Sequence, residues 1–314
     1  MSFWIAMPPT STICERMSVD TPILRATRYL EGLRFDRHEP QPASFVIGAP
    51  RSGTTILHQA LCYVSDVAYI DNLIARFHWY PELGISVSRE LDYPKRWSGR
   101  SRFGATDGVS EPHEFGRFWL DELGVDSMVQ TLQPGEPLSR VRRTLERMSA
   151  VAGKPFLFKV FTLAWHLADF HRHHAPGSRW VYIHRDIESV ALSLLKLRRS
   201  KGSVQEWQSM VPLSALNHVD PYEQVVAQAI GIEGWFDQEL ARIPSACWIR
   251  VDHAALCDDF KAVVRQLTGF TGIGCDESRL EQAAGGIVSP GPIPAAVPGI
   301  DSARLRAVVR AFNG

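Results

Sequence analysis

The chain has 314 residues, 22% of them charged, and its formal net charge at pH 7 is zero. This ordinary globular composition allows a substantial core, and it excludes a protein built mainly to coat nucleic acid or an anionic membrane. The N-terminus lacks a basic segment followed by a long apolar core, the five cysteines show no Cys-x-x-Cys pair, and no apolar run reaches membrane-spanning length. We therefore expect a cytoplasmic protein with reduced thiols, no secretory signal and no membrane span.

The first predicted helix covers 21–33, and a linker then leads to the most specific pattern in the chain. An apolar, β-branched run at 45–47 meets Gly48, four residues separate Gly48 from Gly53, and two threonines open an apolar-periodic segment. The stretch therefore predicts a strand, a tight loop and a helix. Its spacing is that of the phosphate-binding loop, in which backbone N–H groups and a helix N-terminus surround one anion.

The predicted loop lacks the lysine that normally follows its second glycine. Thr54 stands at that position, where a lysine would reach the β- and γ-phosphates of a nucleoside triphosphate. This substitution disfavours an ATP or GTP hydrolase, and Arg51 restores part of the charge from inside the loop. We expect Arg51, Ser52, Gly53, Thr54 and Thr55 to bind phosphate.

A β-prone run at 67–70 ends at Asp71. The carboxyl end of a parallel strand faces the ligand crevice, so Asp71 is a candidate catalytic residue, with a turn or helix cap as the alternative. From about 73 to 153 the periodicity weakens and the polar, aromatic, Gly and Pro content rises. This region predicts an insertion that builds an acceptor pocket.

A helix within this insertion is predicted to open near Ser110. It carries Glu111, His113 and Glu114 close to its start. These side chains are candidates for a general base, and the alternative is that they are acids placed near a helix N-terminus to interact with the helix dipole.

The apolar run at 156–161 predicts a buried strand with one charge inside it, Lys159. A buried ammonium is costly unless an anion meets it, so Lys159 is expected to contact a charged ligand, with a structural ion pair as the alternative. Several histidines end the helix that follows. Cations in a last helical turn need no metal to explain them, so no metal site is expected.

A second anion site is predicted where a strand at 179–184 meets a helix at 187–200. Arg185 follows the strand, and Ser193 lies on the helix. A guanidinium at a strand end and a hydroxyl near a helix N-terminus together suit a phosphate. The alternatives are an arginine paired with a surface carboxylate and an NTPase in which Asp186 is linked to magnesium.

The string PRSGTT at 50–55 resembles the 5′-phosphosulfate loop of sulfotransferases, which use 3′-phosphoadenosine-5′-phosphosulfate (PAPS). Arg185 and Ser193 have the spacing with which these enzymes hold the 3′-phosphate. A strand predicted at 246–251, the turn after it and a helix at 260–267 resemble a late block of the family. The chain is most similar to the bacterial and tyrosylprotein branches.

The resemblance implies one sulfotransferase domain over 1–314 with a P-loop NTPase-like, three-layer α/β fold. A central parallel sheet would be flanked by helices, as the alternation of predicted strands and helices also indicates. The nucleotide core would comprise 43–72 and 154–272, and the insertion at 73–153 would form the acceptor pocket.

The resemblance also implies in-line, metal-independent transfer of a sulfuryl group from PAPS to a hydroxyl or amine. Arg51 and Lys159 would stabilise the leaving phosphate oxygen, and Asp71, Glu111 or His113 would take the acceptor proton. The acceptor would be a small molecule, carbohydrate, lipid or peptide; no nucleic-acid partner is expected, and a homodimer is left open. The alternatives are a P-loop kinase or NTPase that uses ATP and a noncatalytic nucleotide-binding protein.

Overall fold

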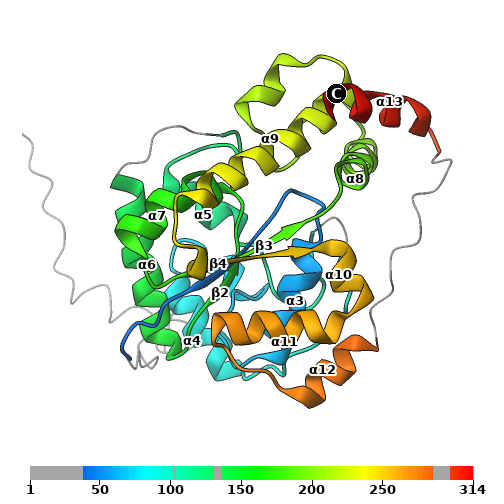
Figure 1. The fold of residues 1–314 in the computed structure, drawn as a ribbon. Coiled ribbons are helices and arrows are strands. Elements are labelled where there is room, and N and C mark those ends of the chain that lie inside the picture. The colour runs from blue at the N-terminus through cyan, green and yellow to red at the C-terminus, as the bar shows by residue number, and fades with distance from the viewer. Residues whose placement is uncertain (1–37, 102–103, 131–135, 286–297, 314) are drawn as a thin grey trace, which may run out of the picture. The chain divides into compact units, whose positions relative to one another are not determined.

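The computed structural model describes residues 38–101, 104–130, 136–285 and 298–313 (Figure 1). The helix predicted at 21–33 lies outside these ranges. Four strands form one parallel sheet in the order β2-β1-β3-β4. The strands are β1 (Ser44–Ile47), β2 (Leu157–Lys159), β3 (Arg179–His184) and β4 (Trp248–Asp252).

Helices precede, separate and follow the later strands. The α-helices of the described ranges are α3 (Thr54–Val64), α4 (Pro81–Leu91), α5 (Gly116–Leu123), α6 (Glu136–Ala152), α7 (Leu167–His174), α8 (Ile187–Ser200), α9 (Pro221–Ala241), α10 (His253–Asp258), α11 (Phe260–Thr271), α12 (Glu277–Ala284) and α13 (Ser302–Asn313). Short 3-10 helices are η1 (Ile74–Phe77), η2 (Thr162–His166), η3 (Leu213–Asn217) and η4 (Ser245–Cys247).

Each face of the sheet packs on its own apolar cluster, because side chains alternate between the two faces of a strand. Val46 and Val181 face a cluster shared with α3, α10, α11 and α12. Phe45 and Trp180 face the other cluster, which α5 to α9 cover. Figure 1 shows the sheet between these two sets of helices. The arrangement confirms the predicted α/β class, a central parallel sheet flanked by helices.

The prediction of a strand at 67–70 is wrong. One parallel bridge, Ala68 to Phe156, places this segment beside β2 at the sheet edge. The chain then leaves the sheet: Ile70 O accepts from His113 N at 2.7 Å, and Asp71 forms an antiparallel bridge with Pro112. The insertion therefore takes the hydrogen bonds that a longer edge strand would use.

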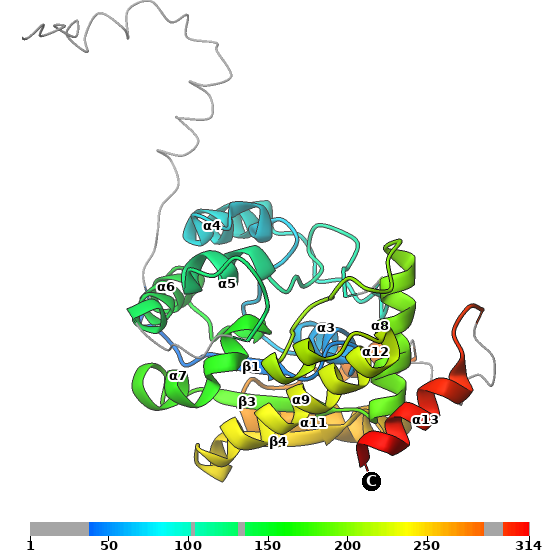
Figure 2. The same ribbon diagram turned by 90° about the horizontal axis from the view of Figure 1, so that it is seen from above.

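The insertion contains α4, α5 and α6, which lie together at one side of the sheet (Figure 2). The helix predicted to open near Ser110 begins at Gly116 instead. Its N-cap, Phe115, has a left-handed φ of 56°, and the Phe115 N–H donates to His113 Nδ1 at 2.8 Å. This turn stops the helix from extending toward its N-terminus, so Glu111, His113 and Glu114 are not in its first turn.

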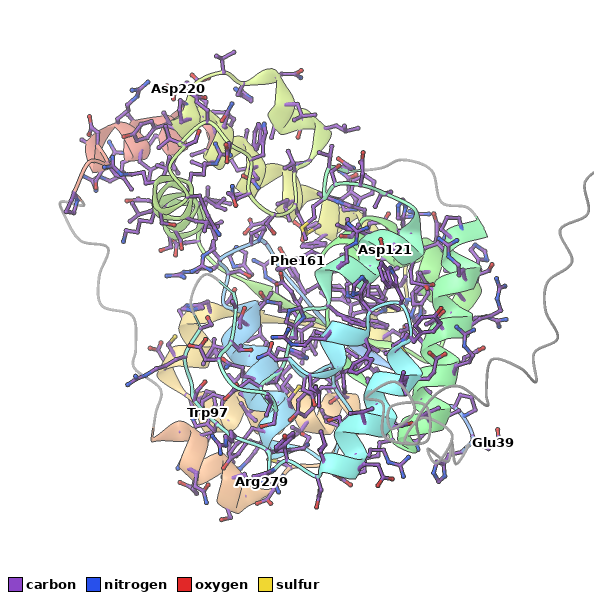
Figure 3. All side chains as sticks on the ribbon, turned by 180° about the vertical axis from the view of Figure 1, so that it is seen from behind. Glu39, Trp97, Asp121, Phe161, Asp220 and Arg279 are labelled. Carbon is purple, nitrogen blue, oxygen red and sulfur yellow. The ribbon has the colours of Figure 1, made fainter. Side chains whose placement is uncertain are left out.

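No helix in the described part of the chain is both long and apolar enough to cross a membrane. In the same residues, no group of three or more His, Cys, Asp or Glu side chains is arranged to hold a metal ion. Side chains crowd both faces of the sheet in Figure 3, in which Phe161 lies in the interior and Asp220 and Arg279 lie at the periphery.

Candidate functional site

The loop between β1 and α3 requires glycine at both of its predicted glycine positions. A Cβ at Gly48 would lie 2.5 Å from Ile183 O and 2.6 Å from Ser52 Oγ, because the loop passes close to β3. Gly53 has a φ of 101°, and a Cβ there would lie 2.5 Å from His253 Cδ2. The glycines therefore let the loop turn tightly against β3 and the start of α10.

The N-terminus of α3 has unused hydrogen-bond donors. Gly53 caps the helix without a side-chain hydrogen bond, and Leu57 N donates to Gly53 O at 3.1 Å. The N–H groups before Leu57 have no partner one helical turn earlier. Ser52 Oγ is buried without a partner in the described residues. Donors gathered at a helix N-terminus form an anion cradle.

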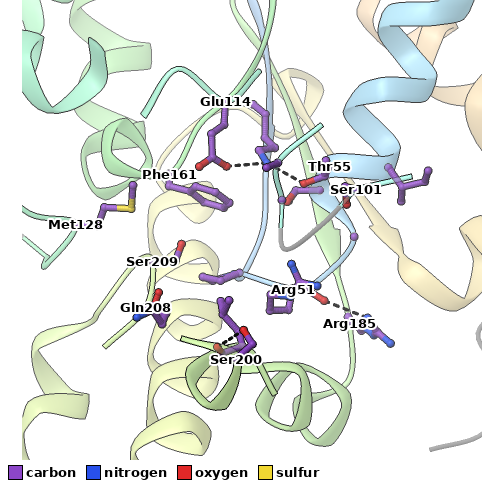
Figure 4. Close-up of a pocket in the computed structure, with 18 of the residues that line it drawn as sticks. Arg51, Thr55, Ser101, Glu114, Met128, Phe161, Arg185, Ser200, Gln208 and Ser209 are labelled. Atoms are coloured by element: carbon purple, nitrogen blue, oxygen red, sulfur yellow. Dashed lines mark hydrogen bonds and ion pairs between the residues drawn. The ribbon is translucent and has the colours of Figure 1, made fainter. Parts of the chain in front are cut away.

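A cavity of about 620 Å³ opens in front of this cradle (Figure 4). The loop supplies one side, the insertion a second and the end of α8 with the chain after it a third. Its lining includes Arg51, Gly53, Thr54, Thr55, Ser101, Asp107, Glu114, Met128, Lys159, Phe161, Arg185, Ser200, Lys201, Gln208 and Ser209.

Lys159 lies at the end of β2 and is the buried charge of the cavity. Its side chain is 2% exposed, and Nζ lies 2.8 Å from Glu114 Oε2. Nζ also donates to Thr55 Oγ1 at 2.8 Å. The structure thus shows the ion pair that the sequence offered as the alternative for Lys159, with a carboxylate of the insertion as its partner, and contact with a charged ligand stays a prediction. One ammonium joins the loop, the sheet and the insertion.

Two arginines, Arg51 of the loop and Arg185 after β3, lie next to each other. Arg185 Nη1 donates to Arg51 O at 3.1 Å, and Arg51 Nε donates to Ser193 Oγ at 3.0 Å. Burial and then the charge of Arg185 lower the pKa of Arg51, which also has a left-handed φ of 74°. A strained loop arginine beside a second arginine from the end of β3 indicates a site for an anion.

The second predicted phosphate site therefore adjoins the first. Arg185 lines the cavity, whereas Ser193 stands behind Arg51 and supports its guanidinium. Since Ser193 Oγ accepts from Arg51, its own O–H remains a donor.

Three predicted base candidates lie outside the lining of the cavity. Asp71 accepts from Ile74 N and from Ser88 Oγ, both at 2.6 Å, so it caps η1 as its alternative role predicted. Glu111 is 2% exposed and accepts from Gln59 Nε2 at 2.9 Å. His113 Nδ1 accepts from Phe115 N, and burial lowers the pKa of the imidazole. We therefore do not propose these residues as the base.

The cavity includes groups that sequence reasoning missed. Met128, Ser200, Lys201, Gln208 and Ser209 line it, although 201–210 is irregular and shows neither periodicity nor a motif. Glu114 was one of three neighbouring candidates, and no sequence signal distinguished it from Glu111. In the structure, Glu114 differs from Glu111 by its ion pair with Lys159.

A model of the sulfotransferase family matches residues 42–277. A solved structure of a sulfotransferase from Mycobacterium avium is similar with a TM-score of 0.55 and 15% identity, covering 92% of this chain and 79% of that one. For a sulfotransferase from Mycobacterium tuberculosis the TM-score is 0.50 and the identity 17%, covering 91% and 80%. At these identities the two structures show the fold. A comparison with curated protein sequences found no match.

Proposed function

The chain belongs to the sulfotransferase family, and we propose that it transfers a sulfuryl group from PAPS to a hydroxyl or amine of an acceptor. The observation that carries this proposal is the convergence of Arg51, Lys159 and Arg185 with the N-terminus of α3 on one cavity. These cations suit a donor that carries a phosphosulfate and a second phosphate.

The donor would be held at two points. The 5′-phosphosulfate would lie in the cradle of 52–55, where the N–H groups of α3 and the hydroxyl of Ser52 are available. The 3′-phosphate would meet Arg185 and the O–H of Ser193. This second contact distinguishes PAPS from nucleotides that lack a 3′-phosphate.

The chemistry would be an in-line displacement at sulfur. The acceptor oxygen or nitrogen forms a bond to sulfur as the bond between sulfur and the 5′-phosphate oxygen breaks. The bonding electrons stay with that oxygen, and 3′-phosphoadenosine-5′-phosphate (PAP) leaves. Lys159 and Arg51 would stabilise the charge that develops on the leaving oxygen.

Glu114 is the proposed general base. It lines the cavity, and its carboxylate contacts the Lys159 ammonium at 2.8 Å, so a proton acceptor lies beside the proposed leaving-group stabiliser. The exposed Asp107 also lines the cavity, but no ion pair or hydrogen bond links its side chain to Lys159 in the described residues. An acceptor hydroxyl beside Glu114 would lose its proton to this carboxylate.

A kinase or NTPase that uses ATP is the competing function. Thr54 stands where such an enzyme has the lysine that contacts the β- and γ-phosphates. The other alternative is a protein that binds a nucleotide without catalysis. The Glu114–Lys159 pair argues against it, because it supplies groups suited to turnover.

The test measures PAP release from PAPS and ADP release from ATP in parallel, with a panel of hydroxyl and amine acceptors. We expect acceptor-dependent PAP release that persists in excess EDTA, because the proposed site stabilises the leaving group with Arg51 and Lys159. ADP release that requires magnesium, without PAP release, would overturn the proposal in favour of the kinase.

A further inference from the structure

An irregular segment, 201–210, follows α8 and forms one side of the cavity; we call it the cavity wall. Lys201 lines the cavity at the end of α8, and Gln208 and Ser209 line it farther along the segment. In Figure 4 the side chains of Gln208 and Ser209 lie on the same side as Phe161 and away from Arg185. Because Arg185 is assigned to the donor nucleotide, the side of the cavity wall is the one left for an acceptor.

A buried polar network fixes the cavity wall. Arg198 is fully buried on α8, and its Nη1 donates to Val204 O at 3.2 Å and to Gln224 Oε1 at 2.7 Å. Its Nη2 donates to Gln228 Oε1 at 3.2 Å. The Gln228 amide, also fully buried, donates to Gln208 O at 2.8 Å. Side chains of two helices thus bind backbone carbonyls of a segment that has no regular structure of its own.

This network costs stability. The acceptors of Arg198 are all uncharged, and burial lowers the pKa of its guanidinium to about 10. A protein that buries a cation without a carboxylate partner is less stable than one with well-packed apolar side chains of the same size at that place. Trp207 covers the guanidinium, with its ring centre 4.7 Å from Cζ. A costly group that fixes an irregular segment indicates that the position of the segment matters.

The cavity wall is also strained and anchored at its far end. Ser209 has a left-handed φ of 65°, a conformation that favours glycine. Beyond it, Val211 forms a parallel bridge with Val129 of the insertion, and Gln130 N donates to Val211 O at 2.8 Å. A non-glycine residue held in this conformation at a cavity is typical of a functional position.

We propose that the cavity wall binds a polyhydroxylated acceptor of the saccharide class, with Gln208 and Ser209 hydrogen-bonding its hydroxyls and Arg198 acting as a positioning residue. An amide and a hydroxyl can each donate and accept, which suits hydroxyl groups. Phe161, which is 9% exposed, lines the same side of the cavity. A lipophilic acceptor would bury these polar groups without partners, at a cost. This inference rests on the proposed sulfuryl transfer.

The experiment measures sulfuryl transfer from PAPS to methyl β-glucoside and maltose, and to the lipophilic alcohols 2-naphthol and estradiol. Transfer to a saccharide is expected. Gln208→Leu and Ser209→Gly should each raise KM for that saccharide about tenfold, as the loss of a hydrogen bond does, with kcat and PAP affinity retained. Ser209→Gly keeps the left-handed backbone, so folding survives. Gln205→Leu, an exposed position of the same segment, is the matched control.

Arg198→Met tests whether Arg198 positions the cavity wall. This variant should also show a raised KM for the saccharide with unchanged PAP binding. If this variant does not fold, Gln208→Leu and Ser209→Gly still decide. Transfer to 2-naphthol or estradiol without transfer to either saccharide would overturn the proposal. So would an unchanged KM in both wall variants, or PAP binding without transfer to any of the four. Failure to bind PAP would instead contradict the proposed function.

Discussion

Lys159 is held by the phosphate loop and by the proposed base at the same time. Its ammonium contacts Thr55 Oγ1 and Glu114 Oε2 at 2.8 Å each. The sequence predicted a charged ligand at this buried ammonium, with a structural ion pair as the alternative, and the structure shows an ion pair with a carboxylate that is 31% exposed. In a pair placed here, the ammonium can stabilise the charge on the leaving oxygen while the carboxylate accepts the proton of the acceptor.

Replacement of Glu114 tests this assignment of roles. Glu114→Gln keeps the size of the side chain and removes the proton acceptor, so kcat should fall about 10²- to 10⁴-fold. PAP should still bind, because Arg51, Arg185 and the N-terminus of α3 are unchanged, although the Lys159 ammonium loses its carboxylate partner. Steady-state kinetics with the best acceptor found for the wild type provide the measurement.

Asp107→Asn is the matched control, because Asp107 lines the same cavity, and within the described residues no ion pair or hydrogen bond joins its side chain to Lys159. Its kcat should stay close to that of the wild type. An equal loss in the two variants would remove the case for Glu114 as the base.

The β1–α3 unit couples the loop to the core through a buried histidine. His58 lies on α3, and its Nε2 is 3.1 Å from Leu157 O on β2. Burial, with a smaller effect of the Lys159 charge, lowers the pKa of His58 to about 3. Imidazole is therefore neutral in the folded protein, and Nε2 donates to the carbonyl.

This histidine should make folding stability depend on pH. The unfolded chain binds a proton at His58 below about pH 6.5, whereas the folded chain does not until about pH 3, so stability rises with pH across this window and is lost as pH falls. By pH 4 the loss from this group alone should be about 3 kcal/mol, taken as an upper bound.

His58→Gln keeps a donor for Leu157 O and removes the titration. Denaturant unfolding at pH 7 and pH 4 should show a smaller loss of unfolding free energy in the variant than in the wild type. Because the two proteins differ only at residue 58, the difference between their losses measures the contribution of this position. Equal losses would show that His58 is protonated in the folded state.

At the scale of the whole molecule, the sheet and its loop could be predicted because they follow local rules. The β1 run, the glycines at 48 and 53 and the helix from 54 are all specified within one short stretch. The predicted parallel direction of the strands also implied that Lys159 and Arg185 lie at one edge of the sheet, because the carboxyl ends of parallel strands meet at the same edge.

The acceptor side could not be predicted in this way, because it is built from long-range contacts. Glu114 and Glu111 look equivalent in sequence, but they have different surroundings in the structure. Glu111 accepts a hydrogen bond from Gln59, and Glu114 lies just before the left-handed turn at Phe115. The cavity wall is irregular, and the residues that fix it lie on α8 and α9. No local pattern reveals such a segment.

The central claim is that this chain binds a nucleotide with two separate phosphate groups, the second of them at Arg185. Isothermal titration calorimetry with PAP and with ADP, in the wild type and in Arg185→Ala, tests it without knowledge of the acceptor. Arg250→Ala is the control, since Arg250 lies on neighbouring β4 and is absent from the cavity lining. PAP should bind more tightly than ADP, and Arg185→Ala should weaken PAP about ten- to hundredfold with little effect on ADP. Equal affinities for PAP and ADP in the wild type, or an undiminished preference for PAP in Arg185→Ala, would contradict the account.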